Sequence, residues 1–140
     1  MKKPWSAFVA ALTTTVLCGC ALTHSASEAK SPFPIEIVPT SPASIASARV
    51  VQEGSDVVIS GTVRKFHEFH LPGKVLVVAC GQDAVPLAEG QAHITDYASK
   101  RGGVKEARFT VPIEMVPPPE TTFRLRYESP GAPDEGLNCR

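Results

Sequence analysis

The sequence predicts an all-β protein, a small antiparallel β-sandwich of about seven strands, and three observations carry this prediction. Apolar and polar residues alternate over several short stretches, which is typical of strands with one buried face. Gly or Pro residues lie in the segments that connect these stretches, and the 140 residues include 13 prolines and 10 glycines. After position 30, no long stretch shows an apolar stripe at helical spacing.

Two segments show the strand pattern most clearly. Residues 122–128 place Phe123, Leu125 and Tyr127 on one face and charged residues on the other. Residues 74–80 are apolar on both faces, which favours a central strand of the sandwich. Between positions 41 and 48 we expect one helical turn at most. The expected strands are 35–38, 49–52, 56–65, 74–80, 90–97, 106–115 and 122–128.

This strand pattern can be called immunoglobulin-like in its architecture. Two of the hallmarks of true immunoglobulin domains, a core tryptophan and a tyrosine corner, are not found, and Trp5 is the only tryptophan. The three prolines 117–119 cannot donate ladder hydrogen bonds. They therefore predict a stiff, extended connection between the last two strands.

The first twenty residues have the composition of a secretory signal. Lys2 and Lys3 precede a short apolar run, 8–17, that is too short to cross a bilayer as a helix. The segment Leu17-Cys18-Gly19-Cys20 then resembles the lipobox of bacterial lipoproteins. The resemblance implies cleavage before Cys20 and acylation of that cysteine, although Cys18 is unusual at its position.

The lipobox divides the chain into three parts. Residues 1–19 are the expected signal peptide, and residues 20–34 are the expected lipidated cysteine with a flexible tether. Residues 35–140 are the expected β-sandwich domain. Ala21 lacks the negative charge that retains enteric lipoproteins at the inner membrane, so the resemblance implies an outer-membrane location facing the periplasm.

The remaining cysteines, Cys80 and Cys139, form one pair if Cys20 is acylated. In an oxidising compartment we expect them to form a disulfide bond. On the chain-entropy model, closing this loop contributes about 4 kcal/mol. Two free thiols or a metal-binding pair are the alternatives.

Three histidines offer a candidate metal site for copper or zinc. His67 and His70 lie in a segment followed by Leu71-Pro72-Gly73, where a bend can bring them together, and His93 lies on another expected strand. Glu68, Asp96 and Cys80 add further candidate ligands. Neither Cys-x-x-Cys nor His-Glu-x-x-His spacing is found, so metal binding is the alternative to the main functional hypothesis.

No other motif indicates catalysis or nucleic-acid binding. The sequence lacks a Gly-x-Ser-x-Gly elbow and a Gly-rich phosphate loop, and its carboxylates select no catalytic pair. Fourteen basic and fourteen acidic residues leave no basic surplus for nucleic acid. Residues 100–105 form a small basic segment that can touch anionic lipid or an acidic partner. We therefore expect neither an enzyme nor a cofactor.

The mature domain also has a weaker resemblance. The segments 61–63, 71–77, 109–114 and 122–127 are similar to pilotin-like β-sandwich lipoproteins associated with bacterial secretion. That resemblance implies a non-catalytic lipoprotein that binds or supports another envelope component. Addition of a strand to an exposed sheet edge is the expected mode of binding.

Overall fold

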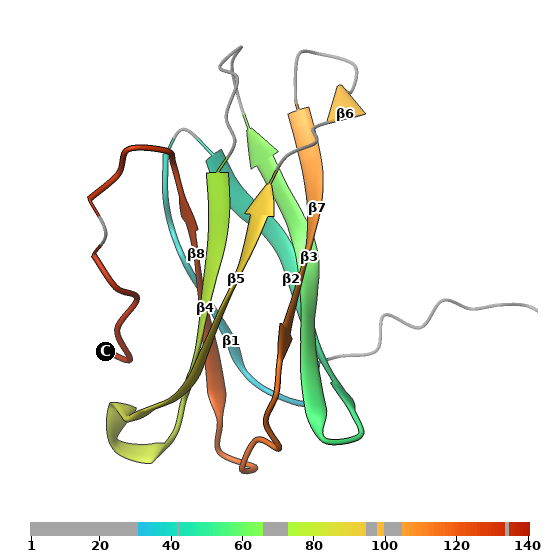
Figure 1. Ribbon diagram of the computed structural model, residues 1–140, viewed down its shortest axis with the longest axis vertical. Coiled ribbons are helices and arrows are strands. Elements are labelled where there is room, and N and C mark those ends of the chain that lie inside the picture. Colours follow the sequence, from blue (N-terminus) through green and yellow to red (C-terminus); the bar gives the residue numbers. More distant parts are fainter. Residues whose placement is uncertain (1–30, 42, 66–72, 95–97, 100–104, 134) are drawn as a thin grey trace, which may run out of the picture.

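Two four-stranded sheets form the fold, which confirms the predicted β-sandwich (Figure 1). The computed structural model describes residues 31–41, 43–65, 73–94, 98–99, 105–133 and 135–140. One sheet has the order β1 (Ile35–Val38), β8 (Thr122–Glu128), β4 (Gly73–Cys80) and β5 (Pro86–Ile94). The other has the order β2 (Ala43–Glu53), β3 (Asp56–Lys65), β7 (Lys105–Ile113) and β6 (Ala98–Ser99).

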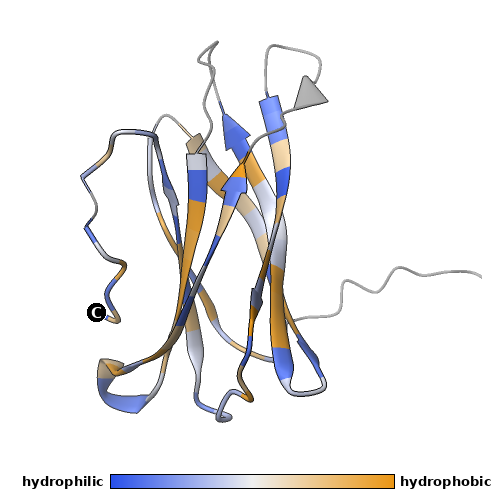
Figure 2. Cartoon of the chain, viewed as in Figure 1, coloured by the Kyte–Doolittle hydropathy of each residue, from blue (hydrophilic) through white to orange (hydrophobic). Residues whose placement is uncertain are grey.

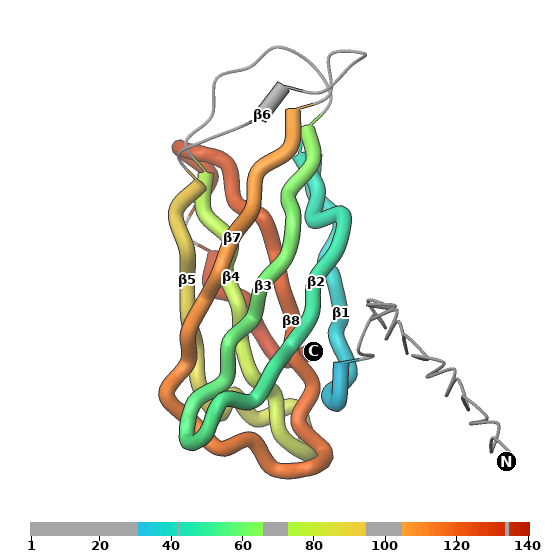
Figure 3. The backbone as a smooth tube through the Cα atoms, turned by 90° about the vertical axis from the view of Figure 1, so that its right-hand side faces the viewer, coloured from blue at the N-terminus to red at the C-terminus, as the bar shows by residue number. Residues whose placement is uncertain are grey.

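The strands pair antiparallel except at one edge, where β1 runs parallel to β8. The hairpins β2–β3 and β4–β5 each lie within one sheet. A short 3₁₀ turn, η1 (Gln82–Ala84), connects β4 to β5. The connection from β7 to β8 crosses between the sheets, as Figure 3 shows from the side. Pro117 is buried within this connection, which places the proline tract where the sequence predicted it.

The core lies between the sheets and is made by the inward residues of each strand. Along β7 and β8 the alternation follows the prediction, with Phe109 and Leu125 buried and Arg108 exposed. Figure 2 shows apolar residues concentrated along the middle of the strands. The central strands supply the fully or almost fully buried residues Val57, Ile59, Val63, Val75, Val77, Ala79, Val111, Phe123, Leu125 and Tyr127.

The bounds of β1, β3 and β8 are those predicted, whereas β7 ends at Ile113 and not at position 115 as expected. Two further expectations were wrong. Residues 43–48 form strand rather than a helical turn, because β2 pairs along the whole of β3, from Ala43 opposite Lys65 onward. The fifth strand begins at Pro86 rather than at position 90, because pairing with β4 starts there. Residues 95–97 of the expected strand lie outside the described residues.

Candidate functional site

The outer face of β4 is covered by the C-terminal segment, which we define as residues 135–140. Val78 points to this outer face and is fully buried. Cys80 and Cys139 are buried beside it, and Leu137 packs against this cluster. A disulfide joins Cys80 to Cys139, with 5.6 Å between their Cα atoms. The two-sided apolar pattern of β4 therefore has two causes, the core on one face and this segment on the other.

Two arginines on β8 hold the backbone of the same segment. Arg124 donates a hydrogen bond to the carbonyl of Asn138, and Arg126 donates one to the carbonyl of Glu135. Arg124 also forms an ion pair with Glu36 on β1, at 3.0 Å. The C-terminal segment is thus fixed by a covalent bond, an apolar contact and two side-chain donors.

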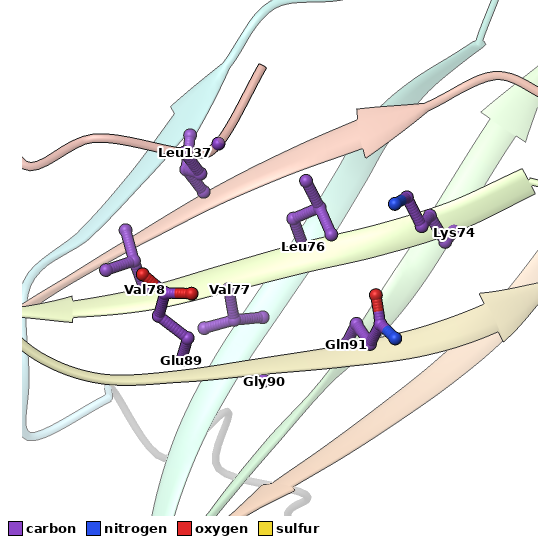
Figure 4. Close-up of a pocket in the computed structure, with 9 residues that line it drawn as sticks. Lys74, Leu76, Val77, Val78, Glu89, Gly90, Gln91 and Leu137 are labelled. Atoms are coloured by element: carbon purple, nitrogen blue, oxygen red, sulfur yellow. The ribbon is translucent and has the colours of Figure 1, made fainter. Parts of the chain in front are cut away.

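A groove of about 470 Å³ lies beside this segment, on the outer face of β4 and β5. Figure 4 shows Leu76 between Leu137 on one side and Gln91 on the other. Glu89 of β5 and Lys74 of β4 add opposite charges to its lining. The groove therefore combines an aliphatic patch at Leu76, Val78 and Leu137 with a polar rim.

A second hollow of about 330 Å³ continues from the groove at Lys74. His93 and Glu128 line it, along with the loop 129–132. The Nζ atom of Lys74 lies 2.8 Å from a carboxylate oxygen of Glu128, whose side chain is only 5% exposed. Glu128 points outward from β8, as predicted, but its ion pairs with Lys74 and Arg126 leave it buried.

The edge strand β5 borders both hollows. Of the edge strands that the structure describes, β1 is short and lies between Pro34 and Pro39, while β2 carries a register shift after Ile45. The edge strand β6 pairs with only the first two residues of β7, and Pro112 interrupts the edge that β7 leaves open beyond them. From Ala88 to Ile94, β5 pairs with β4 without a shift and contains no proline. It is the edge best suited to accept another strand.

The predicted metal ligands are not brought together by any described contact. His67 and His70, with Glu68 and Asp96, lie outside the described residues, and His93 is exposed opposite Lys74 on β4. Cys80 is bound in the disulfide, so it offers no thiolate. Within the described ranges, no group of three His, Cys, Asp or Glu residues is placed to hold a metal ion. Metal binding stays a prediction, which calorimetric titration with Cu(I), Cu(II) and Zn(II) tests.

The predicted basic segment, 100–105, is described only at Lys105. Lys105 lies opposite Lys65 across β7 and β3, and Lys65 is fully buried. Burial lowers the pKa of Lys65, and the nearby charge of Lys105 lowers it further. This buried lysine was not singled out from the sequence, because it stands at the end of an amphipathic strand where exposure is usual.

The groove residues were also missed at the sequence level. The available signal was the two-sided apolar pattern of β4 together with Leu137, which precedes Cys139 by two positions. Once the disulfide is assumed, these two features together indicate that the C-terminal segment returns to cover the outer face of β4.

The chain matches no known protein family, no curated protein and no solved structure. In the part of the chain that the structure describes, no helix has the length and apolar character needed to span a membrane. The lipobox and the resemblance to pilotin-like lipoproteins therefore remain predictions from the sequence.

Proposed function

We propose that this protein is an outer-membrane lipoprotein whose non-catalytic β-sandwich binds another envelope component from the periplasmic side. Cys20 is the proposed lipidation site, and it lies outside the described residues. The observation that carries the binding role is the β5 edge, which runs beside the groove of Leu76, Glu89 and Gln91. An extended segment added to β5 forms main-chain hydrogen bonds, while its alternate side chains enter the groove.

The chemistry of the site favours binding over catalysis. Its floor is aliphatic, and its ion pair between Lys74 and Glu128 is used within the fold. A partner segment with small or apolar residues facing Leu76 suits the floor. A basic group next to Glu89 adds charge complementarity at the rim.

Photo-cross-linking in intact cells tests this proposal. A photoreactive residue at Gln91 is expected to give a discrete adduct with one envelope protein, because Gln91 is exposed on β5 beside the groove. The matched control is Ala46, which is exposed on the edge strand β2 away from the groove. Equal adducts from both positions, or none from Gln91, would reject β5 as the binding edge.

The mass of the membrane-extracted protein tests the anchor separately. The expected mass is that of residues 20–140 with acyl chains, increasing by two hydrogens on reduction of the disulfide. An unacylated chain would reject the lipoprotein assignment while leaving the cross-linking result to be judged by itself.

A further inference from the structure

The described chain enters the sandwich at a defined end, which we call the tether end. Phe33 is buried in the core, and its ring packs edge-on against Phe123 with 5.7 Å between centroids. The amide of Phe123 donates a 2.9 Å hydrogen bond to the carbonyl of Pro34. These contacts fix the entry point beside the first residues of β8.

The large apolar side chains that are exposed lie toward the same end. In the described residues these are Val51 near the β2–β3 turn, Val85 and Leu87 at the start of β5, and Val116 after β7. Figures 1 and 3 both show the β4–β5 hairpin and the β7–β8 connection together at this end. Val116 is 63% exposed and Val85 is 52% exposed. Single exposed valines are common, and it is the grouping of these side chains on neighbouring loops that marks a surface for interaction.

The length of chain before the described part limits how far this end can lie from the lipid. Ser31 lies eleven positions after Cys20. A flexible chain of that length has a root-mean-square span of about 18 Å. An eleven-residue strand such as β2 is about 35 Å long. An anchor at Cys20 therefore holds the tether end, rather than the opposite end, toward the membrane.

We infer that the tether end of the sandwich docks on the lipid surface, with Val85, Leu87 and Val116 inserted among the headgroups. This inference rests on the proposed lipidation of Cys20. Aliphatic side chains on adjoining loops gain by leaving water for the acyl boundary, and the anchor keeps that surface within reach. In this orientation β5 and its groove face sideways into the periplasm.

The charges at this end specify the kind of lipid. Five carboxylates surround the apolar loops, against Arg124 near the start of β8 and the exposed Arg140 next to the disulfide. The described Lys65, Lys74 and Lys105 lie at the opposite end, at the end of β3 and the starts of β4 and β7. The docking surface therefore suits zwitterionic headgroups and is repelled by anionic ones. The carboxylates at the tether end are Glu53, Asp56, Asp83, Glu114 and Glu120.

Introduced tryptophans provide the test, since Trp5 is the only natural one and precedes the cleavage site. The acylated full-length product is reconstituted into phosphatidylcholine vesicles that contain brominated phosphatidylcholine. Val85→Trp and Val116→Trp are the reporters, and Ala132→Trp is the control, exposed beyond the far end of β8. We expect a blue-shifted emission and strong quenching at positions 85 and 116, and neither at 132.

The other outcomes each have a defined meaning. Quenching that falls as anionic lipid replaces phosphatidylcholine, and that salt restores, supports the role of the carboxylates. Unquenched reporters in a protein of acylated mass overturn the docking and leave the anchor intact, and equal quenching at all three positions overturns it too. An unacylated mass overturns the anchor and the docking together. A photoreactive residue at Val116 that captures a protein instead of lipid overturns the docking in favour of a protein partner.

Discussion

Leu137 packs against Val78, which places the C-terminal segment on the outer face of the central strand β4. Val78 is fully buried although it points away from the core between the sheets. The same segment forms one side of the groove beside β5. The shape of the groove therefore depends on how the segment is held.

The disulfide is expected to be the strongest single attachment of this segment. Replacing Cys80 and Cys139 together by alanine removes a cross-link between residues 59 positions apart. We expect the free energy of unfolding to fall by about 4 kcal/mol on the chain-entropy model. Denaturant unfolding of the double variant and the parent protein measures the difference.

Leu137→Ala is the matched control for that experiment, because it keeps the disulfide and removes only part of the apolar contact. Its effect is expected to be smaller than that of the double variant. If both proteins lose the same stability, the cross-link contributes nothing beyond the contact and the prediction is wrong.

The ion pair of Lys74 and Glu128 is expected to stabilise the second hollow, whose lining includes both residues. The carboxylate oxygens of Glu128 lie 2.8 Å from Nζ of Lys74 and 3.3 Å from Nη2 of Arg126, and its side chain is 5% exposed. Glu128→Gln is expected to reduce the free energy of unfolding by about 1.5–3 kcal/mol, the range for hydrogen bonds to charged groups.

A double-mutant cycle with Lys74→Met isolates the pair itself. The effect of Glu128→Gln should be smaller in the Lys74→Met protein than in the parent. Equal effects in the two backgrounds would show that Arg126 alone accounts for the stabilisation.

The sandwich was predictable from local pattern, because strands with one buried face leave period-two alternation that is visible without tertiary information. The bounds of β3 and β8 follow directly from it. The segment 43–48 was not predictable in this way, since its small residues have weak alternation and become strand only through pairing with β3.

The candidate site was less predictable than the fold for a physical reason. Cys80 and Cys139 could be paired on the expectation that Cys20 is acylated and that Cys18 is removed with the signal peptide. The groove depends on where the C-terminal segment lies. Arg124 and Arg126 hold that segment, but the sequence pattern predicts only that their side chains point outward from β8. Nothing local in the sequence states that their donors reach carbonyls of another segment.

Gly61 is expected to be intolerant of any side chain. A β carbon at this position would overlap the carbonyl oxygen of Ser47 and the ring of Phe109, which face it from β2 and β7. Gly61→Ala is expected to lower the free energy of unfolding by about 1–3 kcal/mol, the range for overpacking of a filled core. Thermal and denaturant unfolding measure the loss.

Gly136→Ala is the control, because a β carbon there has no heavy atom within 4 Å. The unfolding midpoint of this variant should match that of the parent. A Gly61→Ala protein as stable as the Gly136→Ala protein would show that β2 moves away from β3 at little cost.

Lys65 is expected to make folding stability depend on pH. Burial and the charge of Lys105 lower the pKa of Lys65 below its ordinary value of 10.5. The unfolded chain then binds this proton more tightly than the folded chain, so the free energy of unfolding increases as pH rises from the lowered pKa toward 10.5. This stabilisation is complete above the unfolded pKa and is lost as pH falls through the folded one. Lys65→Met removes the titration, so the free energy of unfolding of the parent should increase with pH relative to that of the variant.

Lys105→Met separates the two causes of the shift. Without the charge of Lys105, the pKa of Lys65 is lowered only by burial, so the pH dependence should become weaker but not vanish. Urea unfolding at a series of pH values between neutral pH and about pH 10, just below the ordinary pKa of lysine, measures all three proteins. A constant difference between the parent and Lys65→Met over that range would mean that Lys65 keeps its ordinary pKa in the folded chain. A pH dependence unchanged by Lys105→Met would instead assign the whole shift to burial between β3 and β7.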